Sequence, residues 1–160
     1  MSNVYYCTPE GHTDLVELKN NLEMDYNNLN KEVAESIRNS SEDLGENSEY
    51  LQLKESLDRL ERKLVEIKEK ISNAKIIDIL KIPQSGKVTF GCTVTIENLD
   101  TQKVLRFKIV GIDESDIKKE KISLESPLAK AMIGCSIGDD FYYEIGNNDY
   151  AYEVVNIEYI

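Results

Sequence analysis

The sequence predicts a two-part α+β protein, in which an N-terminal antiparallel helical hairpin precedes a small antiparallel sheet with one short helix. Two long apolar stripes with helical spacing occupy residues 15–37 and 53–74. A short acidic break separates these stripes. Beyond Pro83 and Gly86, apolar residues recur at every second position, which is the period of half-buried strands. We therefore expect a hairpin domain at residues 1–80 and a sheet domain at residues 81–160.

The first helix is expected to begin at Pro9. Thr8 followed by Pro9 is typical of a helix N-terminus, with a hydroxyl at the N-cap and proline at the first helical position. The apolar residues that follow recur at steps of three and four: Leu15, Leu18, Leu22, Tyr26, Leu29, Val33 and Ile37. Their mean step lies near the ~3.67 residues of an eleven-residue repeat, which predicts a single apolar stripe along the helix.

The second stripe follows the heptad spacing of a coiled coil. Its members are Leu53, Leu57, Leu60, Leu64, Ile67, Ile71 and Ala74. The positions between them carry mixed charges, as a solvated face does. Two stripes of similar length joined by a short break pack most simply against each other as an antiparallel hairpin within one chain. We expect a monomer, and an intermolecular dimer through the second stripe is the alternative.

Alternating apolar residues in the second half predict about five antiparallel strands. These strands are expected near residues 88–96, 105–109, 121–124, 141–145 and 152–159. In the last strand, Val154 is expected on one face and Ile157 on the other. Between the third and fourth strands, Ser126 as a cap, Pro127 at the first position and Gly134 as a terminator predict one short helix.

The composition limits the possible partners and locations. A formal net charge of −11 over 160 residues argues against autonomous binding to DNA or anionic lipid and favours a protein partner with a basic surface. No segment approaches the ~20 apolar residues of a membrane span, and we expect no membrane association and a cytoplasmic location. The three cysteines, Cys7, Cys92 and Cys135, are odd in number and far apart, so they are expected to be free thiols.

The acidic break has two interpretations. Glu42, Asp43, Glu46 and Glu49 place four carboxylates close together, and Gly45 offers backbone freedom for a tight connection. In the first interpretation, Asp43 and Glu46 form a capping box at the start of the second helix. In the second, exposed carboxylates bind a hard divalent cation. Two carboxylates make a poor magnesium site alone, so a partner or substrate would have to complete the coordination shell.

Several short motifs, read together, resemble a known family over nearly the whole chain. These motifs are DLGENSEY at residues 43–50, AKIID at 74–78, IVG at 109–111, SPLA at 126–129 and IG at 133–134. In this order they resemble the GreA/GreB transcript cleavage factors of bacterial RNA polymerase. The resemblance implies that the hairpin enters the polymerase secondary channel while a C-terminal FKBP-like domain docks at the channel rim.

The resemblance also implies an activity and its residues. Such a factor is not itself an enzyme, because it stimulates the polymerase's own hydrolysis of backtracked RNA. Asp43 and Glu46 would help to hold a Mg²⁺ ion shared with the polymerase active site and to orient the attacking water. The other residues carried over are Asn47, Glu49 and Tyr50 in the tip motif, Arg38 and Lys54 near the nascent RNA 3′ end, and Ser126, Pro127 and Leu128 at the polymerase rim.

Departures from the family pattern leave alternatives open. Glu42 stands where the family commonly has glycine. The basic patch that the resemblance implies near the RNA 3′ end is reduced to Arg38 before the tip and Lys54 after it, which weakens the expectation of efficient cleavage. One alternative is a polymerase-binding inhibitor of the same architecture. Another is a coiled-coil FKBP-like chaperone, for which a larger apolar client surface is expected than the charged hairpin offers.

Overall fold

The structure is a computed structural model that describes residues 4–41 and 43–160. Its helices and strands are β1 (Tyr5–Cys7), α1 (Pro9–Asn39), α2 (Ser48–Ser72), β2 (Ala74–Ile76), β3 (Thr93–Asn98), β4 (Val104–Val110), β5 (Lys121–Ser123), α3 (Pro127–Met132), β6 (Asp140–Ile145) and β7 (Asn148–Glu158). Short 3-10 turns, η1 (Ile79–Lys81), η2 (Ile112–Glu114) and η3 (Ile117–Lys119), lie between them. Within the described residues, no helix is both long and apolar enough to cross a membrane.

The chain forms two compact units that do not follow the expected division at residue 80. The hairpin unit comprises residues 13–73, and the sheet unit comprises residues 4–12 together with 74–160. The reason is that β1 and β2 pair in parallel, with Tyr5 opposite Ala74 and Cys7 opposite Ile76. Ala74, which the sequence placed at the end of the helical stripe, therefore lies in a strand.

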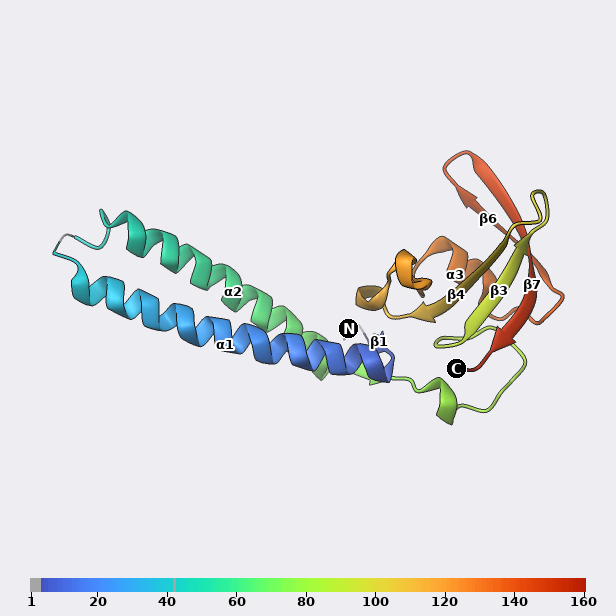
Figure 1. The fold of residues 1–160 in the computed structure, drawn as a ribbon, viewed down its shortest axis with the longest axis horizontal. Helices are drawn as coiled ribbons and strands as arrows, with labels where there is room; N and C mark the ends of the chain where they lie inside the picture. Colours follow the sequence, from blue (N-terminus) through green and yellow to red (C-terminus); the bar gives the residue numbers. More distant parts are fainter. Residues whose placement is uncertain (1–3, 42) are drawn as a thin grey trace. The chain divides into compact units, whose positions relative to one another are not determined.

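Helices α1 and α2 run antiparallel along each other and confirm the predicted hairpin (Figure 1). Leu15 and Leu22 of α1 and Leu64 and Ile67 of α2 are buried. Each such side chain contributes about 1.5–3 kcal/mol when removed from water. The Lys68 ammonium contacts the Glu23 carboxylate across the two helices at 3.3 Å. Because both side chains are about half exposed, this ion pair adds little. Burial of the stripes therefore holds the hairpin together.

The predicted stripe of α1 is wrong at Leu18, which is 38% exposed, and at its end. Ile37 is 44% exposed, whereas the neighbouring Ser36 is only 7% exposed. From Leu22 to Ser36, the residues that face inward are alternately four and three positions apart, because α1 must match the heptad spacing of α2. The Ser36 hydroxyl has no hydrogen-bond partner among the described residues. A polar group thus occupies a seam position near the end of the hairpin.

The sheet unit contains a five-stranded sheet in the order β5-β4-β3-β7-β6. The expectation of a fully antiparallel sheet is wrong at one edge, since β5 pairs with β4 in parallel. The segment between these strands, which contains η2 and η3, brings the chain back beside Lys108, so that β5 runs alongside the last three residues of β4 in the same direction. The remaining neighbours are antiparallel. The sheet is therefore mixed.

Two local irregularities account for the other differences in the sheet. A β-bulge between β3 and β7 adds Val155 as an extra residue, so that Val154 pairs with Ile96 and Ile157 pairs with Val94. Val154 and Ile157 therefore face the same core instead of opposite sides. Gly91 has a φ of 87°, which breaks the expected strand near residues 88–96, and β3 begins only at Thr93.

The first turn of α1 is attached to the sheet unit through Glu114. The Thr8 side chain accepts a hydrogen bond from the Gly11 N–H at 3.1 Å, which confirms Thr8 as the N-cap. The Glu114 carboxylate accepts from the Thr8 N–H at 3.1 Å, from the Gly111 N–H at 2.9 Å and from the Thr8 hydroxyl. The buried Thr8 is thereby held by a residue 106 positions further along the chain.

Neighbouring contacts reinforce this attachment. The Tyr5 hydroxyl donates to the Asp113 carboxylate at 2.9 Å, and burial together with this contact raises the pKa of Tyr5. The Lys121 ammonium donates to the Glu10 carboxylate at 3.1 Å and lowers the pKa of Glu10. Burial raises the pKa of the Cys7, Cys92 and Cys135 thiols, and all three cysteines are free, as predicted.

Candidate functional site

The connection between α1 and α2 is a compact turn built around Asp43. One carboxylate oxygen of Asp43 accepts a hydrogen bond from the Gly45 N–H at 2.9 Å, which is an Asx turn. The Glu46 N–H donates to the Asp43 carbonyl at 2.9 Å, and the Asn47 N–H donates to the Leu44 carbonyl at 3.3 Å. Gly45 does not adopt a positive φ, so the turn does not depend on glycine's backbone freedom.

Helix α2 is capped by Asn47 and not by an Asp43/Glu46 capping box. Asn47 has extended backbone angles, and its side-chain oxygen accepts a hydrogen bond from the Tyr50 N–H at 3.2 Å. Asp43 lies four residues before the cap, so its carboxylate stabilises the preceding turn instead. The capping interpretation of Asp43 and Glu46 is therefore wrong.

The carboxylates of Asp43 and Glu46 are exposed at this end of the hairpin. Asp43 uses one oxygen in the Asx turn, and the Glu46 carboxylate makes no hydrogen bond or ion pair within the described part of the chain. Among the described residues, no group of three or more potential ligands could hold a metal ion alone. The end of the hairpin can therefore offer a hard cation only part of its shell. Glu42 lies outside the described residues.

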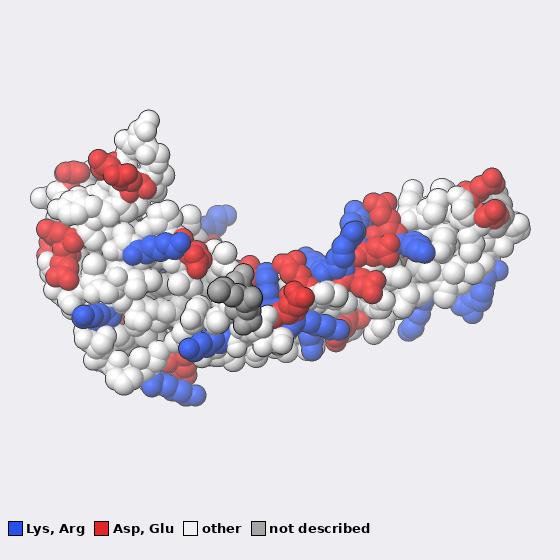
Figure 2. Space-filling view, turned by 180° about the vertical axis from the view of Figure 1, so that it is seen from behind, with Lys and Arg blue, Asp and Glu red and all other residues white. Residues whose placement is uncertain are grey.

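The other residues of the tip motif and its basic neighbours lie on the two helix ends. Glu49 is exposed in the first turn of α2, where a negative charge is favourable. The Lys54 ammonium lies 5.8 Å from the centre of the Tyr50 ring and 3.5 Å from its hydroxyl. Arg38 is exposed in the last turn of α1. Figure 2 shows acidic and basic side chains close together at this end of the hairpin.

The predicted short helix is present as α3 in the sheet unit. The Ser126 hydroxyl oxygen accepts from the Ala129 N–H at 3.2 Å, and Pro127 occupies the first turn with its ring exposed. Leu128 is only partly exposed and packs against the hydrophobic core. Ser126 and Leu128 thus have structural roles, and of the three predicted docking residues Pro127 presents the most accessible side chain.

Comparison with known proteins matches both halves of the chain. A family model described as "Transcription elongation factor, N-terminal" matches residues 5–76, and one described as "Transcription elongation factor, GreA/GreB, C-term" matches residues 83–159. The transcription elongation factor GreA of Psychrobacter sp. (strain PRwf-1) is 39% identical over 156 residues, covering 97% of this chain and 98% of that protein. The chain belongs to the GreA/GreB family of transcription elongation factors.

A second GreA relative agrees with this assignment. The GreA of Pseudomonas aeruginosa is 41% identical over 134 residues, covering 82% of this chain and 85% of that protein. Among solved structures, the GreA factor homolog 1 (Gfh1) of Thermus thermophilus aligns with a TM-score of 0.45 and 22% identity, over 98% of this chain and 99% of that one. Membership in the family supports a regulatory factor over an enzyme.

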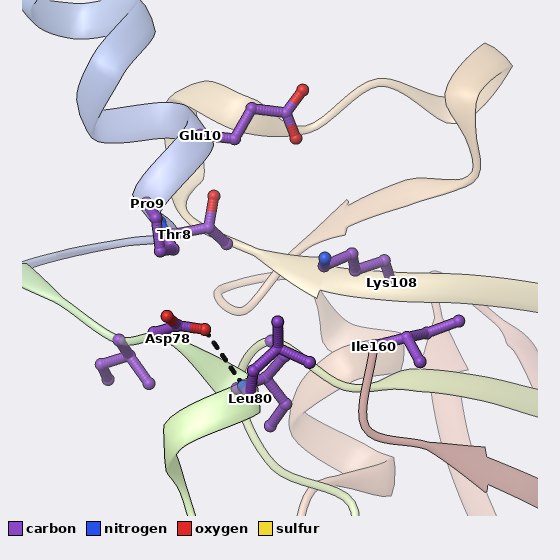
Figure 3. A pocket seen from close by; sticks show the side chains of 10 residues that line it. Thr8, Pro9, Glu10, Asp78, Leu80, Lys108 and Ile160 are labelled. Carbon is purple, nitrogen blue, oxygen red and sulfur yellow. Dashed lines mark hydrogen bonds between the residues drawn. The ribbon is translucent and has the colours of Figure 1, made fainter.

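The sheet unit of this GreA/GreB protein also contains a cavity of about 260 Å³. Figure 3 shows Pro9, Leu80 and Ile160 lining it together with Glu10, Asp78 and Lys108. The Glu10 carboxylate is paired with Lys121, and the Asp78 carboxylate accepts from the Leu80 N–H at 3.1 Å. Because these acidic groups already serve structural contacts, we assign no chemistry to this cavity.

Sequence reasoning missed the structural role of Asn47. The residue was assigned only to the tip motif, although asparagine just before a helix is a strong N-cap signal. The spacing of Asp43 and Glu46 suggested a capping box, whereas the cap is Asn47, the residue that follows Glu46. The correct assignment leaves both carboxylates exposed in the turn.

Proposed function

We propose that this protein binds RNA polymerase and stimulates the polymerase's own cleavage of backtracked RNA, without being an enzyme itself. The observation that supports this most directly is the Glu46 carboxylate, which is exposed beside Asp43 and unpaired within the described residues. The hairpin carries this pair at its end, and membership in the GreA/GreB family makes the polymerase secondary channel the expected place for it.

The residues present fit part of a magnesium site. Glu46 and the second oxygen of Asp43 would supply two carboxylate ligands, and acidic groups of the polymerase would supply the rest. A Mg²⁺ ion held in this way provides charge stabilisation for in-line phosphoryl transfer. The Asx turn fixes the Asp43 side chain before binding, so one ligand is pre-oriented.

The remaining predicted residues have supporting roles in this proposal. Arg38 and Lys54 lie on the helix ends on either side of the turn, where positive charge suits contact with the nascent RNA 3′ end. The Lys54 side chain already rests near the Tyr50 ring, which limits the positions of its ammonium. The α3 edge at Ser126, Pro127 and Leu128 would contact the polymerase rim. We propose that the factor acts as a monomer in the cytoplasm.

The test replaces the two carboxylates by amides of the same size. In Asp43→Asn/Glu46→Gln, the amide oxygen can still accept from the Gly45 N–H, so the turn should persist. Cleavage of 3′-labelled RNA in a stalled elongation complex should fall about a hundredfold or more, because several kcal/mol of charge stabilisation are lost. Raising the magnesium concentration should partly restore RNA cleavage by either single variant, Asp43→Asn or Glu46→Gln, because a weakened site can be filled by mass action.

A charge-matched control is available on the exposed face of α2. Glu61→Gln/Glu69→Gln removes the same charge away from the turn and should leave cleavage unchanged. The double amide variant should still compete with the parent protein for polymerase. Unchanged cleavage by that variant would contradict the role of Asp43 and Glu46. Inhibition of elongation by the parent protein without any RNA cleavage would favour the inhibitor alternative.

A further inference from the structure

The hairpin of β6 and β7 has an unusual composition that the proposed function does not use. Residues 139–153 contain five acidic residues, four tyrosines and one phenylalanine, with no lysine or arginine. The pairing of these strands separates the side chains onto two faces. One face continues the hydrophobic core, and the other is the open face of the sheet.

The core-side face forms an aromatic ladder. Phe141 stacks on Tyr152 with ring centroids 5.8 Å apart, and Tyr143 stacks on Tyr150 at 5.2 Å. Burial and the neighbouring Tyr152 raise the pKa of Tyr143 to about 12, so its hydroxyl stays neutral. Stacked cross-strand pairs stabilise a two-stranded ribbon beyond their area burial. The ladder therefore makes the β6–β7 hairpin a firm support for its other face.

The open face places one exposed tyrosine among opposed like charges. Tyr142 is 70% exposed and lies opposite Ala151. The small side chain of Ala151 leaves the Tyr142 ring uncovered. Glu144 lies directly opposite Asp149 on one side of this pair. On the other side, a row of carboxylates crosses three strands: Asp140 pairs with Glu153, which pairs with Glu97. We call this set of five carboxylates around Tyr142 the acidic tyrosine face.

The acidic tyrosine face carries its negative charge without close cationic partners in the described part of the chain. None of the five carboxylates forms an ion pair among the residues that the structure describes. Arg106, on the same face of the sheet, is already paired with Glu158 at 2.9 Å. Like charges directly opposite in a sheet are destabilising. Figure 2 shows red side chains grouped around the projecting end of this unit.

An ordinary solvated sheet face is the simplest alternative. The open side of an antiparallel sheet is polar by default, and a single exposed tyrosine needs no explanation. Such a face usually intersperses both signs of charge, however, whereas here only acids surround the ring. Arginine and tyrosine are enriched at the centres of protein interfaces, and a guanidinium stacks on an aromatic ring while pairing with carboxylates. The arrangement thus matches a basic protein segment and repels nucleic acid.

We propose that the acidic tyrosine face is a second polymerase-docking surface, which takes an arginine- or lysine-bearing segment of the polymerase over the Tyr142 ring. This inference rests on the proposed function. The face is distinct from the α3 edge, because α3 packs through Ala129 and Met132 on the core side of the sheet. Charge complementarity of this kind increases the association rate and makes it depend on salt.

The test measures the affinity of the full-length protein for core RNA polymerase at several salt concentrations. In Glu144→Gln/Asp149→Asn, the dissociation constant should rise about tenfold at low salt, and its salt dependence should flatten. The melting temperature of this variant should be equal or higher, because a like-charge pair is removed. Tyr142→Ser should weaken binding about tenfold while the salt dependence remains.

The control Asp100→Asn/Glu120→Gln removes the same charge from exposed turns of the sheet unit and should bind like the parent. If the parent binds polymerase and stimulates cleavage but the variants of this face bind equally well, the docking inference is wrong while the proposed function stands. If the parent itself does not bind polymerase, the proposed function fails. A change only in self-association would assign the face to a second copy of this chain and would also overturn the inference.

Discussion

At the scale of single residues, Gly11 and Glu114 depend on each other. A Cβ atom at position 11 would overlap the Glu114 side chain, which holds the backbone of Thr8 and Gly111. Hydrogen bonds to a charged group contribute about 1.5–3 kcal/mol each when well formed. Glycine at this helical position is therefore required by the carboxylate beside it and not by backbone conformation.

The effect of a Gly11 substitution on the free energy of unfolding should change sign when Glu114 is replaced. In the parent protein, Gly11→Ala should lower the free energy of unfolding by roughly 1–3 kcal/mol, because Glu114 must leave its hydrogen bonds. In a Glu114→Ala background the overlap is gone. There the same substitution should raise the free energy of unfolding by up to about 1 kcal/mol through helix propensity. Urea denaturation of the four proteins in this cycle measures both effects, and equal effects in both backgrounds would disprove the coupling.

The same residues show what local sequence can and cannot reveal. Thr8 and Pro9 predicted the start of α1 correctly, because capping depends on residues three positions apart. The contact of Glu114 with Thr8 carried no such signal, since the two residues lie 106 positions apart in the sequence. At the other end of the hairpin, Asp43 and Glu46 were correctly placed in the exposed connection, but the cap fell on Asn47.

At the scale of elements, α3 offers a clean test of the proposed rim contact. Leu128 packs against the core, so replacing it would disturb folding as well as binding. Pro127→Ala removes only an exposed ring, and alanine is a good helix former. The dissociation constant for core polymerase should rise about tenfold if this ring is an interface anchor. Pro83→Ala, another exposed proline of the same unit, should bind like the parent, and an equal affinity of both variants would remove Pro127 from the interface.

Element types were predictable because long periodic segments dominate the sequence, whereas positions that depend on a partner element were not. The spacing of apolar residues in α1 predicted that Ile37 is buried, but packing against the heptads of α2 buries Ser36 instead. The five strands were found, yet the bulge at Val155 moved Ile157 to the core face. Neither a bulge nor the direction of a strand produces a periodic pattern in the sequence, because both depend on how a strand pairs with its neighbour.

At the scale of the whole molecule, the boundary between the units can be tested at Ile79. This residue follows β2 and was assigned by sequence to the hairpin domain, but it is 5% exposed within the core of the sheet unit. Ile79→Ala should lower the free energy of unfolding by about 2–5 kcal/mol. The adjacent Leu80 is 74% exposed, so Leu80→Ala should change it by less than about 0.5 kcal/mol. If urea denaturation showed similar losses of unfolding free energy for the two variants, this segment would be a linker and not part of the core of the sheet unit.

The attachment of residues 4–12 to the sheet unit has a consequence for synthesis on the ribosome. The contacts within the α1/α2 hairpin join residues that emerge soon after one another, and such local structure forms early. Strand β1 must wait for β2, and Thr8 must wait for Glu114, which is translated more than one hundred residues later. Loop closure over that separation carries an entropic cost before any contact forms. The first residues described at the N-terminal end are therefore expected to be among the last to reach their native partners.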